Sequence, residues 1–142
     1  MKTIKFGDKE YQIQFGYIVT AKSGIIGKIA NIEKMMKGEK TPEEIDKFLM
    51  FIPEIVLVGL QKFHRDEFGY DYNTGEGKDA ALDKVGSLVD DYFDREDADF
   101  NKLLDTLTEE LMNNSFLSKL FREEQENQAK KIQKKSQKKE EN

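Results

Sequence analysis

The sequence predicts a mainly α fold: a small helical domain with an N-terminal β-hairpin and a charged, disordered C-terminal tail. Three observations lead to this prediction. Apolar residues alternate with polar ones over residues 2–15, and they recur at helical spacing from there to residue 121. From residue 122 onward almost every side chain is polar or charged. We therefore expect one domain over residues 1–121 and a flexible tail over residues 122–142.

The densest apolar run lies between Thr41 and Phe68, and we expect the rest of the chain to pack around it. Its beginning has the features of a helix start. Thr41 can cap the helix, Pro42 suits the first helical position, and Glu44 stands where a capping box requires it. Such a run is apolar over most of a helix's circumference, so it should be buried on most sides.

Pro53 interrupts this run. A proline lacks the backbone N–H and crowds the preceding turn, so we expect a kink or a break near Ile52. We take Pro53–His64 as the central helix. A buried strand at Ile55–Leu60 is the alternative, because periodicity alone does not exclude it. The expected core includes Val56, Leu60 and Phe63.

Residues 2–15 (KTIKFGDKEYQIQF) form two alternating runs around Gly7-Asp8, which is typical of a β-hairpin. One face of this hairpin is apolar and consists of Ile4, Phe6, Tyr11, Ile13 and Phe15. A lone hairpin is only marginally stable in water. Its apolar face should therefore lie on the helices or pair with another subunit.

Three further helices follow from apolar residues at spacings of three and four. They cover Tyr17–Lys37, Lys78–Phe93 and Asp97–Leu111, with a short apolar turn over residues 116–121. The glycines after Ser23 weaken the first of them and can split it there. Its expected buried stripe is Ile18, Ala21, Ile25, Ile29, Ile32 and Met36.

The segment Gly69–Gly77 (GYDYNTGEG) is expected to be a loop, because it holds three glycines and shows no periodicity. Tyr70 and Tyr72 in this loop could form a contact site for a partner. The more ordinary interpretation, which we favour, is that both tyrosines pack on neighbouring helices.

Nothing in the sequence indicates catalysis, a cofactor or a metal site. The chain has no cysteine, and its only histidine, His64, has no partner at a recognisable spacing. A group of acidic residues between two expected helices is better explained by helix ends than by calcium, since the calcium-loop glycine and glutamate are missing. These residues are Asp90, Asp91, Asp94, Glu96, Asp97 and Asp99.

Charge is unevenly distributed along the chain. Residues 1–121 carry 16 Lys/Arg and 23 Asp/Glu, while residues 122–142 carry seven Lys/Arg and five Glu. An acidic body disfavours binding to nucleic-acid phosphates. No apolar run is long enough to span a bilayer, and the N-terminus does not have the pattern of a signal peptide. We therefore expect a soluble protein without nucleic-acid or membrane partners.

The order of segments resembles that of the tail assembly chaperones of long-tailed phages (siphophages) that infect Gram-positive bacteria. The resemblance covers residues 1–120. It rests on the hairpin IKFGDKEYQIQFGY, the helix TAKSGIIGKIANIEKM and the apolar stretch FIPEIVLVGLQKFHRDEFGYDY. These are patterns of hydrophobicity and segment order rather than an invariant motif.

The resemblance implies a small helical, non-enzymatic protein in the cytoplasm of the infected bacterial host. Such a chaperone binds the tape measure protein and keeps this long helical chain soluble while the tail is assembled. The tail tube protein is a second candidate partner. The resemblance also implies a longer form made by ribosomal frameshifting. Because one tape measure protein would need many copies of the chaperone, we further expect self-association into a homo-oligomer.

Candidate partner or self-association surfaces follow from the apolar stripes. They comprise residues of the hairpin, the loop and the last long helix: Phe6, Tyr11, Ile13, Tyr70, Tyr72, Phe100, Leu104, Leu107 and Leu111. The main alternative function is an acidic inhibitor or regulator of a nucleic-acid-binding protein, suggested by the acidic body. A third hypothesis is a metal-dependent enzyme that uses His64 and the aspartates.

The composition of the tail leads to a first testable prediction. From Arg122 onward only Ala129 and Ile132 are apolar, so the tail has almost nothing to bury. A chain that ends at Phe121 should melt within about 4 °C of the full chain, a difference of less than about 1 kcal/mol. Thermal unfolding followed by circular dichroism measures this, and a larger drop would show that the tail packs on the domain.

Overall fold

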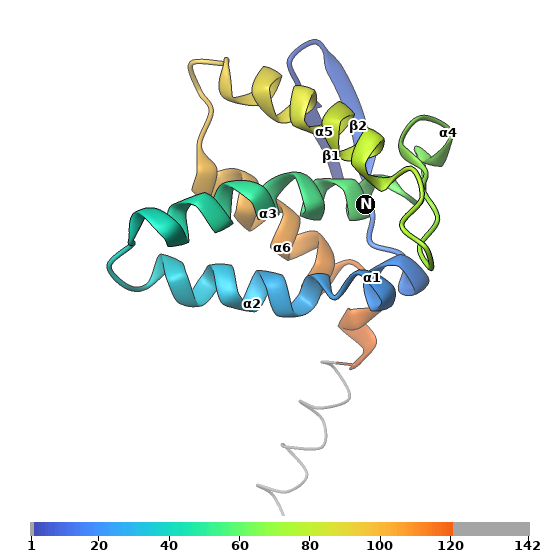
Figure 1. The fold of residues 1–142 in the computed structure, drawn as a ribbon, viewed down its shortest axis with the longest axis horizontal. Coiled ribbons are helices and arrows are strands. Elements are labelled where there is room, and N and C mark those ends of the chain that lie inside the picture. Colours follow the sequence, from blue (N-terminus) through green and yellow to red (C-terminus); the bar gives the residue numbers. More distant parts are fainter. Residues whose placement is uncertain (1, 121–142) are drawn as a thin grey trace, which may run out of the picture.

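The computed structural model describes residues 2–120, which form a hairpin and a set of helices around one long helix (Figure 1). The expected fold class, mainly α with an N-terminal β-hairpin, is confirmed. The expected tail over residues 122–142 lies outside the described residues. The elements in chain order are β1 (Lys2–Phe6), β2 (Lys9–Ile13), α1 (Tyr17–Ser23), α2 (Ile25–Met36), α3 (Pro42–Leu60), α4 (Arg65–Phe68), α5 (Lys78–Phe93) and α6 (Phe100–Asn113).

The hairpin is antiparallel, with a register that runs from Lys2 opposite Ile13 to Phe6 opposite Lys9. Its two-residue turn begins at Gly7, whose φ of 64° is a conformation that glycine adopts without strain. The strands contact α3 and α5, and the apolar face of the hairpin is buried. The sequence left open whether this face packs on the helices or pairs with another subunit. In the structure it packs on helices of the same chain.

Helix α3 occupies the centre of the described structure and contacts α1, α2, α4, α5, α6 and β2. In Figure 1, α2 and α5 lie on opposite sides of α3, and α6 crosses behind it. The segment Ile55–Leu60 is buried throughout. The expectation that this apolar run organises the fold is therefore confirmed, and the alternative of a buried strand is wrong.

Of the two outcomes expected near Pro53, a kink or a break, the break does not occur. Helix α3 runs unbroken through this proline and ends at Leu60, four residues before the predicted end at His64. The carbonyl that loses its hydrogen-bond donor to the proline belongs to Leu49, a residue exposed to solvent, so water can satisfy it. Phe48, Ile52 and Ile55 form one continuous buried stripe across the proline, and this packing holds both halves in a single helix.

The predicted start of α3 is confirmed in atomic detail. The Thr41 hydroxyl accepts a hydrogen bond from the Glu44 backbone N–H at 3.2 Å, and Pro42 occupies the first turn. At the other end the chain leaves the core earlier than expected. Phe63, expected in the core with Val56 and Leu60, is 43% exposed because it lies beyond the end of the helix.

The helix expected over Tyr17–Lys37 is divided into α1 and α2 at Gly24, which has a φ of 66°. This left-handed glycine ends one helix and starts the next in a new direction. The division also changes which residues are buried. Val19 and Thr20 face the core in place of Ile18 and Ala21, which are exposed, whereas the Ile25, Ile29 and Ile32 stripe is buried as expected.

Asp99 caps the start of α6. The Asp99 carboxylate accepts hydrogen bonds from the backbone N–H groups of Asn101 and Lys102 at 2.8 and 3.4 Å. Asp97 instead forms an ion pair with Arg95 at 2.9 Å. The helix consequently begins three residues later than predicted, and Phe100 becomes its first residue.

The hairpin and α3 make their closest approach at Gly59. A Cβ atom at this position would lie 2.7 Å from Ile13 Cγ2 and 3.3 Å from the Phe15 ring. The Gln14 backbone N–H donates to the Gly59 carbonyl at 3.0 Å. Because Ile13 and Phe15 are almost fully buried, neither side chain has room to retreat.

The substitution Gly59→Ala tests this close packing. In an open helical position the change would stabilise by about 0.5–1 kcal/mol, but here we expect a net loss of about 1–3 kcal/mol from overpacking. Gly27→Ala in α2 is the matched control, since nothing lies within 4 Å of its added methyl group. Urea unfolding of both variants gives the two values. Equal stabilisation by both changes would contradict the packing described for Gly59.

Candidate binding surface

Most of the nine residues that the sequence predicted as a partner or self-association surface are buried. Seven of them are less than 10% exposed, and Tyr72 is partly buried. Of the nine, only Phe100 has a substantial exposed fraction, at 39%. The seven buried residues are Phe6, Tyr11, Ile13, Tyr70, Leu104, Leu107 and Leu111.

Tyr11 anchors the hairpin to α4. Its ring packs edge-on against Phe68 at a centroid distance of 5.4 Å, and its hydroxyl donates to the Glu67 carboxylate at 3.1 Å. Burial raises the pKa of the Tyr11 hydroxyl, and the hydrogen bond to Glu67 raises it further. This tyrosine is therefore a neutral hydrogen-bond donor within the fold.

The two loop tyrosines are held by the end of α3. Their rings pack edge-on at 5.0 Å, and the Tyr72 hydroxyl donates to the side chain of buried Gln61 at 3.1 Å. The Arg65 guanidinium lies 4.6 Å above the Tyr72 ring. Burial, followed by the nearby Tyr72 hydroxyl, raises the pKa of Tyr70. The loop thus uses its tyrosines for internal packing, the interpretation that the sequence analysis favours.

His64 also has a structural contact. Its Nε2 atom accepts a hydrogen bond from the Gln12 backbone N–H at 3.0 Å, and its ring packs against Tyr11 at 4.9 Å. This bond ties the hairpin to the segment after α3. Within residues 2–120, no three His, Asp or Glu side chains are placed together to hold a metal ion.

An exposed apolar surface lies instead around the first half of α3. We call it the α3 patch and define it as Ile45 and Leu49 on α3 together with Phe100 on α6, which line one hollow. Met50 is exposed as well, but it points about 100° around the helix from Leu49. Ile45 and Leu49 are 42% and 46% exposed, and Met50 is 71% exposed. Ile45 and Leu49 stand one turn apart, so they project from the same side of the helix.

The patch rests on a group of packed aromatic rings. Phe100 stacks on Phe93 of α5 with a centroid distance of 4.1 Å and an interplanar angle of 30°. It also lies 5.7 Å from buried Phe48 of α3. Phe100 is thus held from two sides, and its remaining surface faces solvent. Rings held in this way present apolar area with little loss of side-chain freedom on binding.

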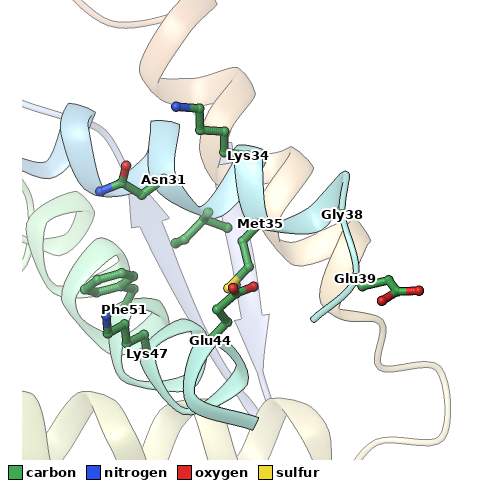
Figure 2. Close-up of a pocket in the computed structure, with 9 residues that line it drawn as sticks. Asn31, Lys34, Met35, Gly38, Glu39, Glu44, Lys47 and Phe51 are labelled. Carbon is green, nitrogen blue, oxygen red and sulfur yellow. The ribbon is translucent and has the colours of Figure 1, made fainter. Parts of the chain in front are cut away.

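Two grooves run along opposite sides of α3. The first, of about 720 Å³, lies between α2 and α3 and is shown in Figure 2. Met35 of α2 and Phe51 of α3 lie between the two helices in this view. Charges of both signs line this groove: Lys34, Lys47, Glu39 and Glu44.

The second groove, of about 460 Å³, lies between α3 and α5. Leu49 and Phe100 of the α3 patch form part of its wall. A smaller hollow of about 310 Å³ joins Leu49 and Phe100 to Ile45 and to Met35 of α2. The patch therefore borders hollows large enough to accept several aliphatic side chains from a partner.

A second exposed apolar group lies near the end of the described chain. Tyr17 is 68% exposed and packs against Phe116 at 5.2 Å, and Leu120 is 50% exposed. The described chain ends at Leu120, so this group is defined only in part. The α3 patch is the better-defined candidate.

The sequence did not single out Ile45, Leu49 and Met50 as exposed, because the whole apolar run was expected to be buried. One signal could have revealed them. Five consecutive apolar residues, from Phe48 to Ile52, point in all directions around a helix, whereas a helix at the surface buries only one side. Some residues of such a run must face solvent unless the helix is surrounded.

Comparison with known proteins assigns the chain to no family. No protein-family model, curated protein or solved structure matches it. Among the described residues, every helix is too short or too polar to cross a membrane.

Two leucines of α3 test the distinction between core and patch. Leu60→Ala should cost about 2–5 kcal/mol, because it empties a fully buried site. Leu49→Ala removes the same atoms from a site that is 46% exposed, and should cost less than about 1 kcal/mol. Urea unfolding compares the pair directly. A similar large loss for both would mean that Leu49 belongs to the core.

Proposed function

We propose that this chain is a phage tail assembly chaperone that binds the tape measure protein and keeps it soluble during tail assembly. The exposed apolar α3 patch, which borders the α3/α5 groove and a smaller hollow toward α2, is the structural observation that supports this proposal. The resemblance in segment order over residues 1–120 supplies the identity of the client. Neither the hairpin nor the loop tyrosines supply the contact, because the fold uses them internally.

The physical reason is the client's shape. A long amphipathic helix exposes an apolar stripe that aggregates in water. A helix-lined groove can cover such a stripe by accepting side chains spaced at three, four and seven residues. Ile45, Leu49 and Phe100 offer apolar area that needs no rearrangement of the core to become accessible. The proposed chaperone acts by binding alone and requires no cofactor.

Many copies would act on one client. The tape measure protein is far longer than a domain of this size, so successive segments of the client would each be covered by a copy of the chaperone. The cytoplasm of the infected host is the proposed site of action. A gene position directly upstream of a very long helical open reading frame would support this assignment, whereas a position beside transcriptional regulators would favour the acidic-inhibitor alternative.

Coexpression with the tape measure protein tests the proposal. The chain should bring the tape measure protein into the soluble fraction and copurify with it in several copies. Ile45→Asp combined with Leu49→Asp should abolish copurification, because both side chains are exposed in the patch and become charged. Ile18→Asp is the matched control, since Ile18 is 58% exposed but lies on α1.

Thermal melts should show that all variants remain folded. The complex should persist at about 0.5 M salt, where the Debye length falls to about 4 Å and surface charge attraction is screened. Dissociation at that salt concentration would favour the acidic-inhibitor alternative. A tape measure protein that stays insoluble with the wild-type chain would refute the chaperone function.

A further inference from the structure

The groove between α3 and α5 differs from the other groove along α3 in the sign of its charge. Its lining is mostly apolar or small: Leu49, Ile52, Pro53, Leu82, Gly86, Ser87, Val89, Phe93 and Phe100. The charged residues in it are Asp83 and Asp90, both on α5. The groove between α2 and α3 instead carries two lysines and two glutamates, so its charges balance.

The two aspartates have no partner of opposite charge within residues 2–120. Neither carboxylate takes part in an ion pair or a side-chain hydrogen bond with the rest of the described chain. The nearest lysine on α5, Lys84, is engaged elsewhere, because its ammonium group donates to the Glu67 carbonyl at 3.2 Å. The negative charge of this groove is therefore available to a partner.

The two aspartates stand two helical turns apart on α5. Asp83 and Asp90 are seven residues apart, which places them on one side of α5 and about 10 Å apart along its axis. Leu82, Val89 and Phe93 line the groove beside them. In a partner helix that lies along this groove, residues i and i+7 are also about 10 Å apart along the axis. Side chains at these two positions could therefore reach the two carboxylates at the same time.

We propose that the α3/α5 groove docks an amphipathic helix whose apolar stripe is flanked by Lys or Arg side chains about seven residues apart. This inference rests on the proposed function and defines the class of client segment that the chaperone selects. Apolar contacts with Leu49, Phe93 and Phe100 provide most of the affinity. The two carboxylates favour basic flanks and repel acidic ones.

Two designed peptides of about 20 residues provide the direct test. Both are helical and share one apolar stripe, but one carries Lys at the flanking i and i+7 positions and the other carries Glu. Fluorescence anisotropy with the full chain should show that the Lys peptide binds about tenfold more tightly, since two weak attractions replace two weak repulsions. The double variant Asp83→Lys, Asp90→Lys should reverse this preference.

A charge-matched control separates the groove from the charge of the whole chain. Glu39→Lys combined with Asp105→Lys makes the same change in net charge, but these residues line the α2/α3 groove and a hollow between α2 and α6. The control should retain the preference for the Lys peptide. Reversal by the control to the same extent as by the groove variant would overturn the proposal.

The remaining outcomes distinguish this inference from the proposed function. Tight, equal binding of both peptides would leave the chaperone function standing and overturn the selectivity. Binding of neither peptide, while the tape measure protein is still made soluble, would also overturn the groove as the docking site. Failure of both peptides and of the tape measure protein would refute the proposed function itself.

Two other occupants of the groove would also overturn the proposal. If Lys130→Glu combined with Lys134→Glu in the full chain tightened binding of the Lys peptide tenfold, the groove would belong to the chain's own lysine-rich end. If the wild-type chain formed an oligomer that the groove variant dissociated in analytical ultracentrifugation, the groove would belong to a second copy. We expect neither change.

Discussion

The contact between the hairpin and the second half of α3 is the constraint on which the rest of the structure depends. The segment Ile55–Leu60 is apolar around its whole circumference, so it is stable only when every side is covered. Helices alone leave the side at Gly59 open, and the hairpin fills it with Ile13 and Phe15. Gly59 permits the approach, and the Gln14 hydrogen bond to its carbonyl sets the position of the hairpin.

This arrangement divides α3 into two parts with different roles. The second half is enclosed by the hairpin, α4 and α5, whereas the first half is covered on fewer sides. Phe48 and Ile52 extend the buried stripe, but Ile45, Leu49 and Met50 face solvent. One continuous helix therefore provides both the centre of the core and the exposed patch.

Pro53 lies where these two parts meet. A proline in a helix leaves one carbonyl without a donor, and here that carbonyl belongs to exposed Leu49 rather than to a residue of the core. The same residue forms part of the wall of the α3/α5 groove together with Pro53. The apolar wall of this groove thus includes the point inside α3 where the proline removes one backbone hydrogen bond.

The fold class, the hairpin and the start of α3 follow from the sequence alone, because they depend on local signals. Alternating residues around Gly7-Asp8 specify the hairpin, and Thr41 with Glu44 specifies the helix start through contacts within one turn. The division at Gly24 was likewise indicated by neighbouring glycines. In each case, residues close together in the chain determine the outcome.

Only the tertiary structure decided which apolar residues are buried. Periodicity placed Phe63 and Ile18 in the core and left Leu49 there as well, yet all three are exposed. The loop tyrosines and the hairpin face were predicted as binding surfaces, yet both are used in internal packing. Tyr72 donates a hydrogen bond to Gln61, and Ile13 of the hairpin packs against Gly59. Exposure depends on which distant elements cover a side chain, and no local pattern contains that information.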